Sequence, residues 1–207
     1  MMRTEARRKT GPRAITCAAA LAIGAICSPA AGAPDKCDPD RATVDRAIAL
    51  RDSGQQRQAQ AVLNGLLNKD KGNFGANFIL GTIEISSGGA SAEAGLQRLV
   101  TTERSLASKD KECAKQLGWY SIYNSIGAQF YRKKNLDRSE QYLLLGYAHL
   151  SDMPLYTRRL ILSNLGLLYF AKGDVDKSQK FYREAARAGS PDAKKRLATI
   201  QRIKSSN

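Results

Sequence analysis

Apolar residues recur at helical spacing along most of the chain, and the recurrences come in pairs separated by turn residues. The last pair is the clearest. Gly166 and Tyr169 lie three residues apart on one face of a first predicted helix, and Gly173 follows as a helix breaker. The markers of the second helix, at i, i+4 and i+7, are Ser178, Tyr182 and Ala185. Because Gly166 would let two helices approach closely, this segment predicts a packed helix–turn–helix unit.

Three upstream segments carry markers at similar spacing, and they depart further from the pattern of the last pair toward the N-terminus. The third segment has Ile126, Gly127 and Phe130, then Ser139, Leu143 and Gly146; the second has Leu80, Gly81 and Glu84, then Ala92, Leu96 and Leu99; the first has Ala47, Leu50, Gly54, Ala59, Leu63 and Leu66. The sequence therefore predicts four repeats at about 40–73, 74–105, 120–153 and 159–190, with an insertion at 106–119. A short segment, 34–39, precedes the first repeat.

These intervals resemble the tetratricopeptide repeat, and the last unit also resembles the related Sel-like repeat. The resemblance implies an all-α, right-handed α-solenoid that binds a partner polypeptide on its concave side. The chain departs from the family pattern at Glu84, where an aromatic residue is expected. This departure predicts either looser helix packing in the second unit or a slip of one residue to Ile85. The early Trp of the family is absent from all four units, since Trp119 precedes the markers of the third.

The segment 191–207 reads as a capping helix and tail. Ser190 is a predicted N-cap, Pro191 suits the first helical position, and the apolar stripe of the helix consists of Ala193, Leu197 and Ile200. The end of a solenoid needs such a helix with a polar back. The alternative is a frayed basic tail.

Residues 1–33 read as a secretory signal peptide with cleavage near 30–33. A basic leading segment precedes an apolar run at 14–27, and small residues follow it. Cleavage after Ala33 would leave Pro34 first, whereas cleavage after Ala30 avoids this. An uncleaved N-terminal anchor is the alternative, although a run of this length is short for a membrane span. A lipoprotein signal is disfavoured by Ile26 before Cys27. We expect no stable membrane span after cleavage, and a periplasmic or secreted protein.

The chain is strongly basic, with 33 Lys and Arg against 19 Asp and Glu, a formal charge of +14. Without residues 1–33, it would hold 28 basic and 18 acidic residues, a charge of +10. Such a charge can attract nucleic acid, anionic lipid or acidic proteins. Export argues against nucleic acid, and the scattered basic residues are also typical of a solvated helical surface.

Two cysteines, Cys37 and Cys113, remain after signal cleavage. An oxidising compartment would favour a disulfide between them. Two unpaired buried thiols are the alternative, because the sequence does not give the separation of the two residues.

The residue types needed for catalysis are sparse. His149 is the only histidine, and no nucleophile, phosphate-binding or metal-ligand motif accompanies it. It is therefore interpreted as a capping or surface residue. The sequence predicts no enzyme activity, no cofactor and no metal site.

The first helices of a stack of this kind line its concave side, so residues one turn from the packing positions are candidate partner-binding residues. These are Phe78, Thr82, Asn124, Ala128, Tyr131, Arg132, Ser163, Leu167 and Phe170. Ordinary packing between repeats is the alternative for Phe78, Leu167 and Phe170. The predicted function is a non-catalytic scaffold that docks a protein or peptide partner. The alternative is a basic envelope protein that binds an anionic glycan or lipid.

Overall fold

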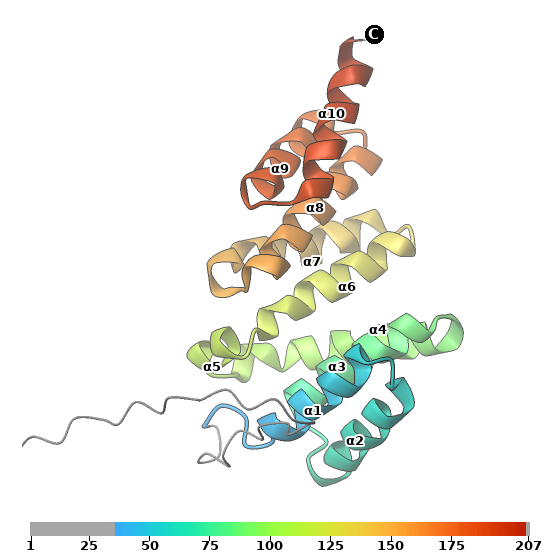
Figure 1. Cartoon of the computed structure of the whole chain (residues 1–207), viewed down its shortest axis with the longest axis vertical. Helices are drawn as coiled ribbons and strands as arrows, with labels where there is room; N and C mark the ends of the chain where they lie inside the picture. The colour runs from blue at the N-terminus through green and yellow to red at the C-terminus, as the bar shows by residue number, and fades with distance from the viewer. Residues whose placement is uncertain (1–35, 206–207) are drawn as a thin grey trace, which may run out of the picture. The chain divides into compact units, whose positions relative to one another are not determined.

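The computed structural model describes residues 36–205, all of which belong to one compact unit that spans residues 33–207 (Figure 1). The predicted signal peptide at 1–33 lies outside the described residues. Every element of the described residues is helical, and the predicted all-α fold of stacked helix pairs is confirmed.

Four helix pairs follow one another along the chain (Figure 1). They are α1 (Arg41–Asp52) with α2 (Gln56–Lys69), α3 (Phe74–Ser87) with α4 (Gly89–Arg104), α6 (Ile122–Arg132) with α7 (Leu136–Ala148), and α8 (Leu155–Ala171) with α9 (Val175–Arg187). The short helix α5 (Lys111–Gln116) separates the second pair from the third, and α10 (Pro191–Ser205) ends the described chain. Within each pair the helices pack closely, and each first helix also contacts the first helix of the next pair. The first helices therefore form a continuous row.

Side-chain caps fix where several helices begin. Asn73, Asn135 and Asp174 each accept a hydrogen bond from the backbone N–H three residues later, at 2.9, 3.1 and 3.0 Å. Such bonds satisfy backbone donors that the first turn of a helix leaves open. Ser190 does the same for α10 through the N–H of Ala193, at 3.4 Å. The polar residues between the apolar runs thus define the repeat boundaries.

The turn between the two helices of a pair needs a left-handed residue. Gly54 and Gly173 occupy this position in the first and fourth pairs, both with φ of +81°. In the third pair the residue is Lys134, with φ of +62°. A residue with a Cβ atom is strained in this conformation.

We expect the Lys134→Gly variant to be more stable than the parent protein by about 0.5–1 kcal/mol, because relief of the strain outweighs the added freedom of the unfolded chain. Urea unfolding measures the difference. Lys134→Ala is the matched control, since it removes the ammonium group and keeps the strain. A Lys134→Gly protein no more stable than Lys134→Ala would contradict the assignment of strain.

Small residues set the closest helix contacts. A Cβ atom on Gly166 would lie 2.7 Å from the ring of Tyr182, so the fourth pair closes over a bare backbone, as the sequence predicts. The second pair is tighter still. A Cβ on Gly95 of α4 would lie 2.6 Å from the carbonyl oxygen of Gly81 on α3. The looser packing expected from Glu84 is therefore wrong, because the two backbones touch at Gly81 and Gly95.

The buried side chains form two clusters. The smaller cluster joins α1, α2 and part of α3 and centres on Leu63 and Ile83. The larger cluster extends from Phe74 on α3 to Ile200 on α10. Phe78 packs against both clusters, so it links the smaller cluster to the larger one.

The inserted segment is anchored at two points. At its end, the Trp119 ring is buried and packs on Phe74, with ring centroids 4.5 Å apart. Within α5, Cys113 forms a disulfide with Cys37, which lies just ahead of α1. The predicted pairing of the two cysteines is confirmed. Next to Cys37, the Asp38 side chain is buried, and its Oδ1 accepts bonds from the N–H of Asp40 and from Asn73.

Helix α10 is the predicted capping helix. Ala193 and Ile200 are buried against the larger cluster, and Leu197 is half-buried beside them. Lys194 and Lys195 are exposed on its other side. The apolar stripe thus covers the open end of the fourth pair. Because this contact stabilises α10, residues 191–205 form a helix and not a frayed tail.

A hydrogen-bonded ion pair joins the third and fourth units. Glu140 on α7 accepts a bond from the Tyr169 hydroxyl at 2.6 Å and one from the Lys172 ammonium at 2.5 Å. These two bonds lower the pKa of the Glu140 carboxyl, whereas burial and the same carboxylate raise the pKa of Tyr169 to about 12.

Because the pKa of Glu140 is lower in the folded protein than in the unfolded chain, its contribution is present at neutral pH and is lost on acidification. We expect Glu140→Gln to lower stability at pH 7, and the difference from the parent to shrink as the pH falls below the usual carboxyl pKa of about 4. Urea unfolding across this range measures the difference. Asp137→Asn is the control, because the Asp137 side chain bonds the same ammonium but is almost fully exposed. A constant difference at every pH would contradict the linkage.

None of the helices among residues 36–205 has the length and apolar character needed to cross a membrane.

Candidate functional site

A groove of about 410 Å³ lies between α8 and the start of α10. Its lining combines apolar, amide, hydroxyl, guanidinium and carboxylate groups from the two helices and from the residue that precedes α10: Tyr156, Arg159, Leu160, Ser163, Asn164, Leu167, Ser190, Pro191, Asp192 and Arg196. Ser163 and Leu167 were predicted from the sequence as partner-facing positions. Tyr156 is 70% exposed, so a large aromatic surface stands uncovered at one end of the groove.

The wall of the groove is fixed by contacts between α8 and the turn before α10. The Nε of Arg159 donates to the carbonyl oxygen of Ala188 at 2.5 Å, next to Gly189 with φ of +88°. The hydroxyls of Ser163 and Ser190 lie 3.4 Å apart. The carbonyl of Ala188 at the end of α9 would otherwise lack a helical partner. Arg159 therefore caps the C-terminal end of this helix and also lines the groove.

An amide pair extends the polar lining toward the third unit. The Nδ2 of Asn164 on α8 donates to the Oδ1 of Asn124 on α6 at 2.9 Å. Each amide keeps further donor or acceptor capacity after this single bond. Two successive first helices therefore present coupled amides, which is the chemistry needed to bind a peptide backbone.

A smaller pocket of about 120 Å³ adjoins the groove through a shared residue, Arg196. Its lining also includes Phe170, Tyr182, Thr199 and Ile200. The guanidinium carbon of Arg196 lies 6.0 Å from the centre of the Tyr182 ring. Burial raises the pKa of the Tyr182 hydroxyl, so this ring stays neutral at physiological pH. Phe170 is 44% exposed, and thus an aromatic side chain is available at the second end of the surface.

The other predicted residues do not line either pocket. Phe78 is a packing residue, Thr82 donates within its own helix to the carbonyl of Ile79 at 2.7 Å, and Ala128 is half-buried on α6. Tyr131 is half-buried against the larger cluster. Arg132 is exposed, and its NH1 donates to Gln129 at 3.2 Å. Their role in binding stays a prediction.

Sequence reasoning missed Asn164, Arg159 and Arg196. Counted from the marker glycines, the counterpart of Asn124 is Ser163, because each lies three residues ahead of its glycine. The structure pairs Asn124 with Asn164 instead. Successive first helices are therefore offset by about one residue where they meet. A search for amides on neighbouring first helices that allowed this offset would have found the pair.

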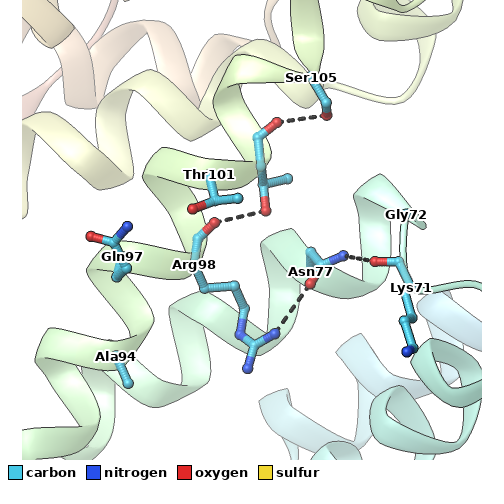
Figure 2. A pocket seen from close by; sticks show the side chains of 9 residues that line it. Lys71, Gly72, Asn77, Ala94, Gln97, Arg98, Thr101 and Ser105 are labelled. Atoms are coloured by element: carbon cyan, nitrogen blue, oxygen red, sulfur yellow. Dashed lines mark hydrogen bonds between the residues drawn. The ribbon is translucent and has the colours of Figure 1, made fainter.

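A second pocket, of about 520 Å³, lies on the second pair of helices (Figure 2). It is formed by one face of α4 with the residue after it, by the turn that leads into α3, and by the first part of α3. The lining comprises Lys71, Gly72, Asn77, Ala94, Gln97, Arg98, Thr101, Thr102 and Ser105. Many of these side chains are short, which is why α4 leaves a hollow here.

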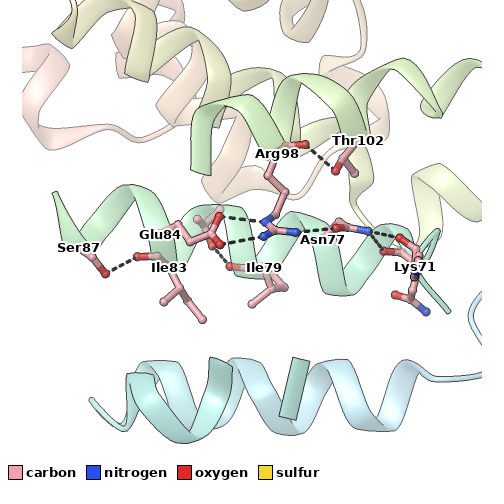
Figure 3. Close-up of polar contacts among 10 residues, drawn as sticks. Lys71, Asn77, Ile79, Ile83, Glu84, Ser87, Arg98 and Thr102 are labelled. Carbon is pink, nitrogen blue, oxygen red and sulfur yellow. Dashed lines mark hydrogen bonds and ion pairs between the residues drawn. The ribbon is translucent and has the colours of Figure 1, made fainter. Parts of the chain in front are cut away.

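A polar network underlies this pocket and explains Glu84. The Nε and NH2 atoms of Arg98 donate to the two carboxylate oxygens of Glu84 at 2.9 and 3.0 Å, and NH1 donates to Asn77 at 3.1 Å (Figure 3). The amide of Asn77 in turn donates to the carbonyl of Lys71 at 2.9 Å (Figure 3). A two-pronged ion pair thus takes the place of the aromatic contact that the repeat pattern predicts.

The single histidine packs against an aromatic ring and lies near a carboxylate. The ring of His149 stacks on Tyr120 with centroids 4.0 Å apart, and its Nδ1 lies 3.6 Å from Asp152. His149 is also the C-cap residue that follows α7. Among residues 36–205, no three His, Cys, Asp or Glu side chains are grouped in a way that could hold a metal ion.

Comparison with known proteins adds evidence on the fold. No protein-family model matches the chain, and no curated protein matches it significantly. Among solved structures, it is similar to PilF of Pseudomonas aeruginosa, a lipoprotein that contains tetratricopeptide repeats. The TM-score is 0.66 at 15% identity, and the match covers 80% of this chain and 69% of PilF. The chain has a tetratricopeptide-like helical repeat fold.

Proposed function

We propose that the protein is an exported, non-catalytic scaffold that docks a partner polypeptide on the surface formed by α6, α8 and α10. The observation that carries the proposal is the groove between α8 and α10, together with its amide pair Asn124–Asn164. An extended peptide offers alternating backbone donors and acceptors, which the two amides can bind. Tyr156 in the groove and Phe170 in the adjoining smaller pocket supply rigid apolar contacts.

The likeness to PilF supports a repeat scaffold, since stacked helix pairs commonly serve to bind other proteins. The disulfide Cys37–Cys113 supports export, because such bonds form and persist in oxidising compartments. The basic charge of the chain favours an acidic partner segment, and Arg196 places one of these charges in the groove.

Site-specific photo-crosslinking tests the proposal. A photoreactive phenylalanine analogue at Ser163, inside the groove, is compared with the same analogue at Gln141, which is exposed on α7. The expected result is a discrete protein adduct from Ser163 only, mapped by mass spectrometry to one segment of the partner. Adducts of equal yield from both positions would contradict the groove.

A synthetic peptide of the mapped segment then gives the affinity. We expect Asn164→Ala and Arg196→Ala each to weaken binding about tenfold, and Gln141→Ala to leave it unchanged. Binding that is independent of both groove residues and is abolished by moderate salt would instead favour a general electrostatic interaction with the cell envelope.

A further inference from the structure

The pocket between α4 and the turn before α3 is chemically different from the groove. Its lining contains two cationic side chains, Lys71 and Arg98, and no carboxylate. Two acidic groups outside the lining bind residues that belong to it. Glu84 is bound by Arg98, and the Oδ1 of Asp70 accepts the backbone N–H of Gly72 at 2.9 Å. Because Glu84 compensates the charge of Arg98, the pocket presents the remaining N–H donors of this guanidinium and the positive charge of Lys71 to whatever enters it.

The donors of the pocket fall into a fixed base and an accessible rim. At the base, Arg98 is held in place because three of its five N–H groups bind Glu84 and Asn77 (Figure 3), which leaves two for a ligand. At the rim, Lys71, Gln97 and Thr101 are exposed. None of these three side chains is engaged by another group in the part of the chain that the structure describes. Guanidinium and ammonium groups are both commonly used by proteins to bind an anion.

The size and the neutral groups of the pocket further restrict the chemical class of ligand that it could bind. A volume of about 520 Å³ is within the range of pockets that hold small organic molecules. The amide of Gln97 and the hydroxyl of Thr101 can bind alcohol groups, and the methyl of Ala94 offers an apolar contact. We propose that this pocket binds a small acidic sugar, with the carboxylate or phosphate near Arg98 and Lys71 and the sugar hydroxyls near Gln97 and Thr101. This site is separate from the docking groove and does not depend on it.

Nuclear magnetic resonance titration of the isotope-labelled protein tests this site. Glucuronate and glucose 6-phosphate are the two acidic probes, and glucose is the neutral control. We expect saturable changes in amide chemical shift, centred on Gly72, Asn77, Gln97 and Thr101, with at least one acidic sugar at a Kd of about 1 mM, and none with glucose. Comparison of the two acidic probes tells a sugar acid from a sugar phosphate.

Two variants locate the binding. Lys71→Glu reverses a charge at the rim, and Thr101→Trp fills the hollow from an exposed position; each is expected to weaken binding at least about tenfold. Lys69→Glu is the matched control, because it makes the same charge change just outside the lining and should leave the affinity within about twofold. The proposal is overturned if no probe gives saturable shifts, if glucose binds as well as the acids, or if Lys69→Glu weakens binding as much as Lys71→Glu.

Discussion

Replacing Gly95 by alanine is expected to lower the free energy of unfolding by about 3 kcal/mol, an effect at the upper end for overpacked sites. The added Cβ would lie 2.6 Å from the carbonyl oxygen of Gly81, and 2.8 Å from both the backbone nitrogen of Ile85 and the Cβ of Glu84. These atoms belong to the backbone of α3 or are attached to it directly, so no side-chain rotation relieves the clash. Urea or thermal unfolding measures the loss.

Gly65→Ala is the matched control for this substitution. Gly65 is also inside a helix, α2, but an added Cβ there meets nothing within 4 Å. Alanine is the better helix former by about 1 kcal/mol, so this variant should be more stable than the parent. If Gly95→Ala were also stabilising, helix propensity would dominate at both sites, and the close contact of α3 with α4 would be refuted.

Removing the disulfide is expected to lower the free energy of unfolding by about 4 kcal/mol, the chain-entropy value for a long closed loop. The two cysteines are 76 residues apart in sequence, so the bond greatly restricts the unfolded chain. The double variant Cys37→Ser/Cys113→Ser avoids a free thiol. Urea unfolding of this variant and of the parent protein, each with and without reductant, gives the difference.

Reductant should lower the stability of the parent to that of the double variant and leave the double variant unchanged. Hydrogen exchange adds a local readout, because the protection lost first should be that of residues near Cys37 and of α5. An oxidised parent no more stable than the double variant would show that the closed loop contributes nothing to stability.

The architecture could be predicted from the sequence because helix contacts in this fold depend on single small residues at regular intervals. Gly166 and Gly127 mark two of the helix crossings, and the structure places Tyr182 and Leu143 against them. In the second unit the repeat pattern fails at Glu84, since a carboxylate is unfavourable at a packing position unless it has a partner. Its partner, Arg98, lies 14 residues away on the facing helix. Periodicity within one helix carries no information about such a pairing.

The candidate site was predictable only in part. Ser163 and Leu167 followed from the face of α8, because one helix determines which way they point. The place of Arg196 in the groove depends on how α10 crosses α8. The place of Arg159 depends on the hydrogen bond by which its guanidinium caps the C-terminal end of α9. Both depend on contacts between elements. The repeat pattern therefore predicts the row of first helices, and the packing of the last helix determines which residues form a groove.

The disulfide also determines how the protein would respond to mechanical force. A pull on the chain ahead of Cys37 passes through the covalent bond to Cys113 in α5. Residues 38–112, which include the first two helix pairs, lie in parallel with that bond and carry no tension. A tether attached to the N-terminal side would thus load the third and fourth pairs directly. Those pairs form most of the proposed docking surface, whereas the pocket on α4 stays within the unloaded loop.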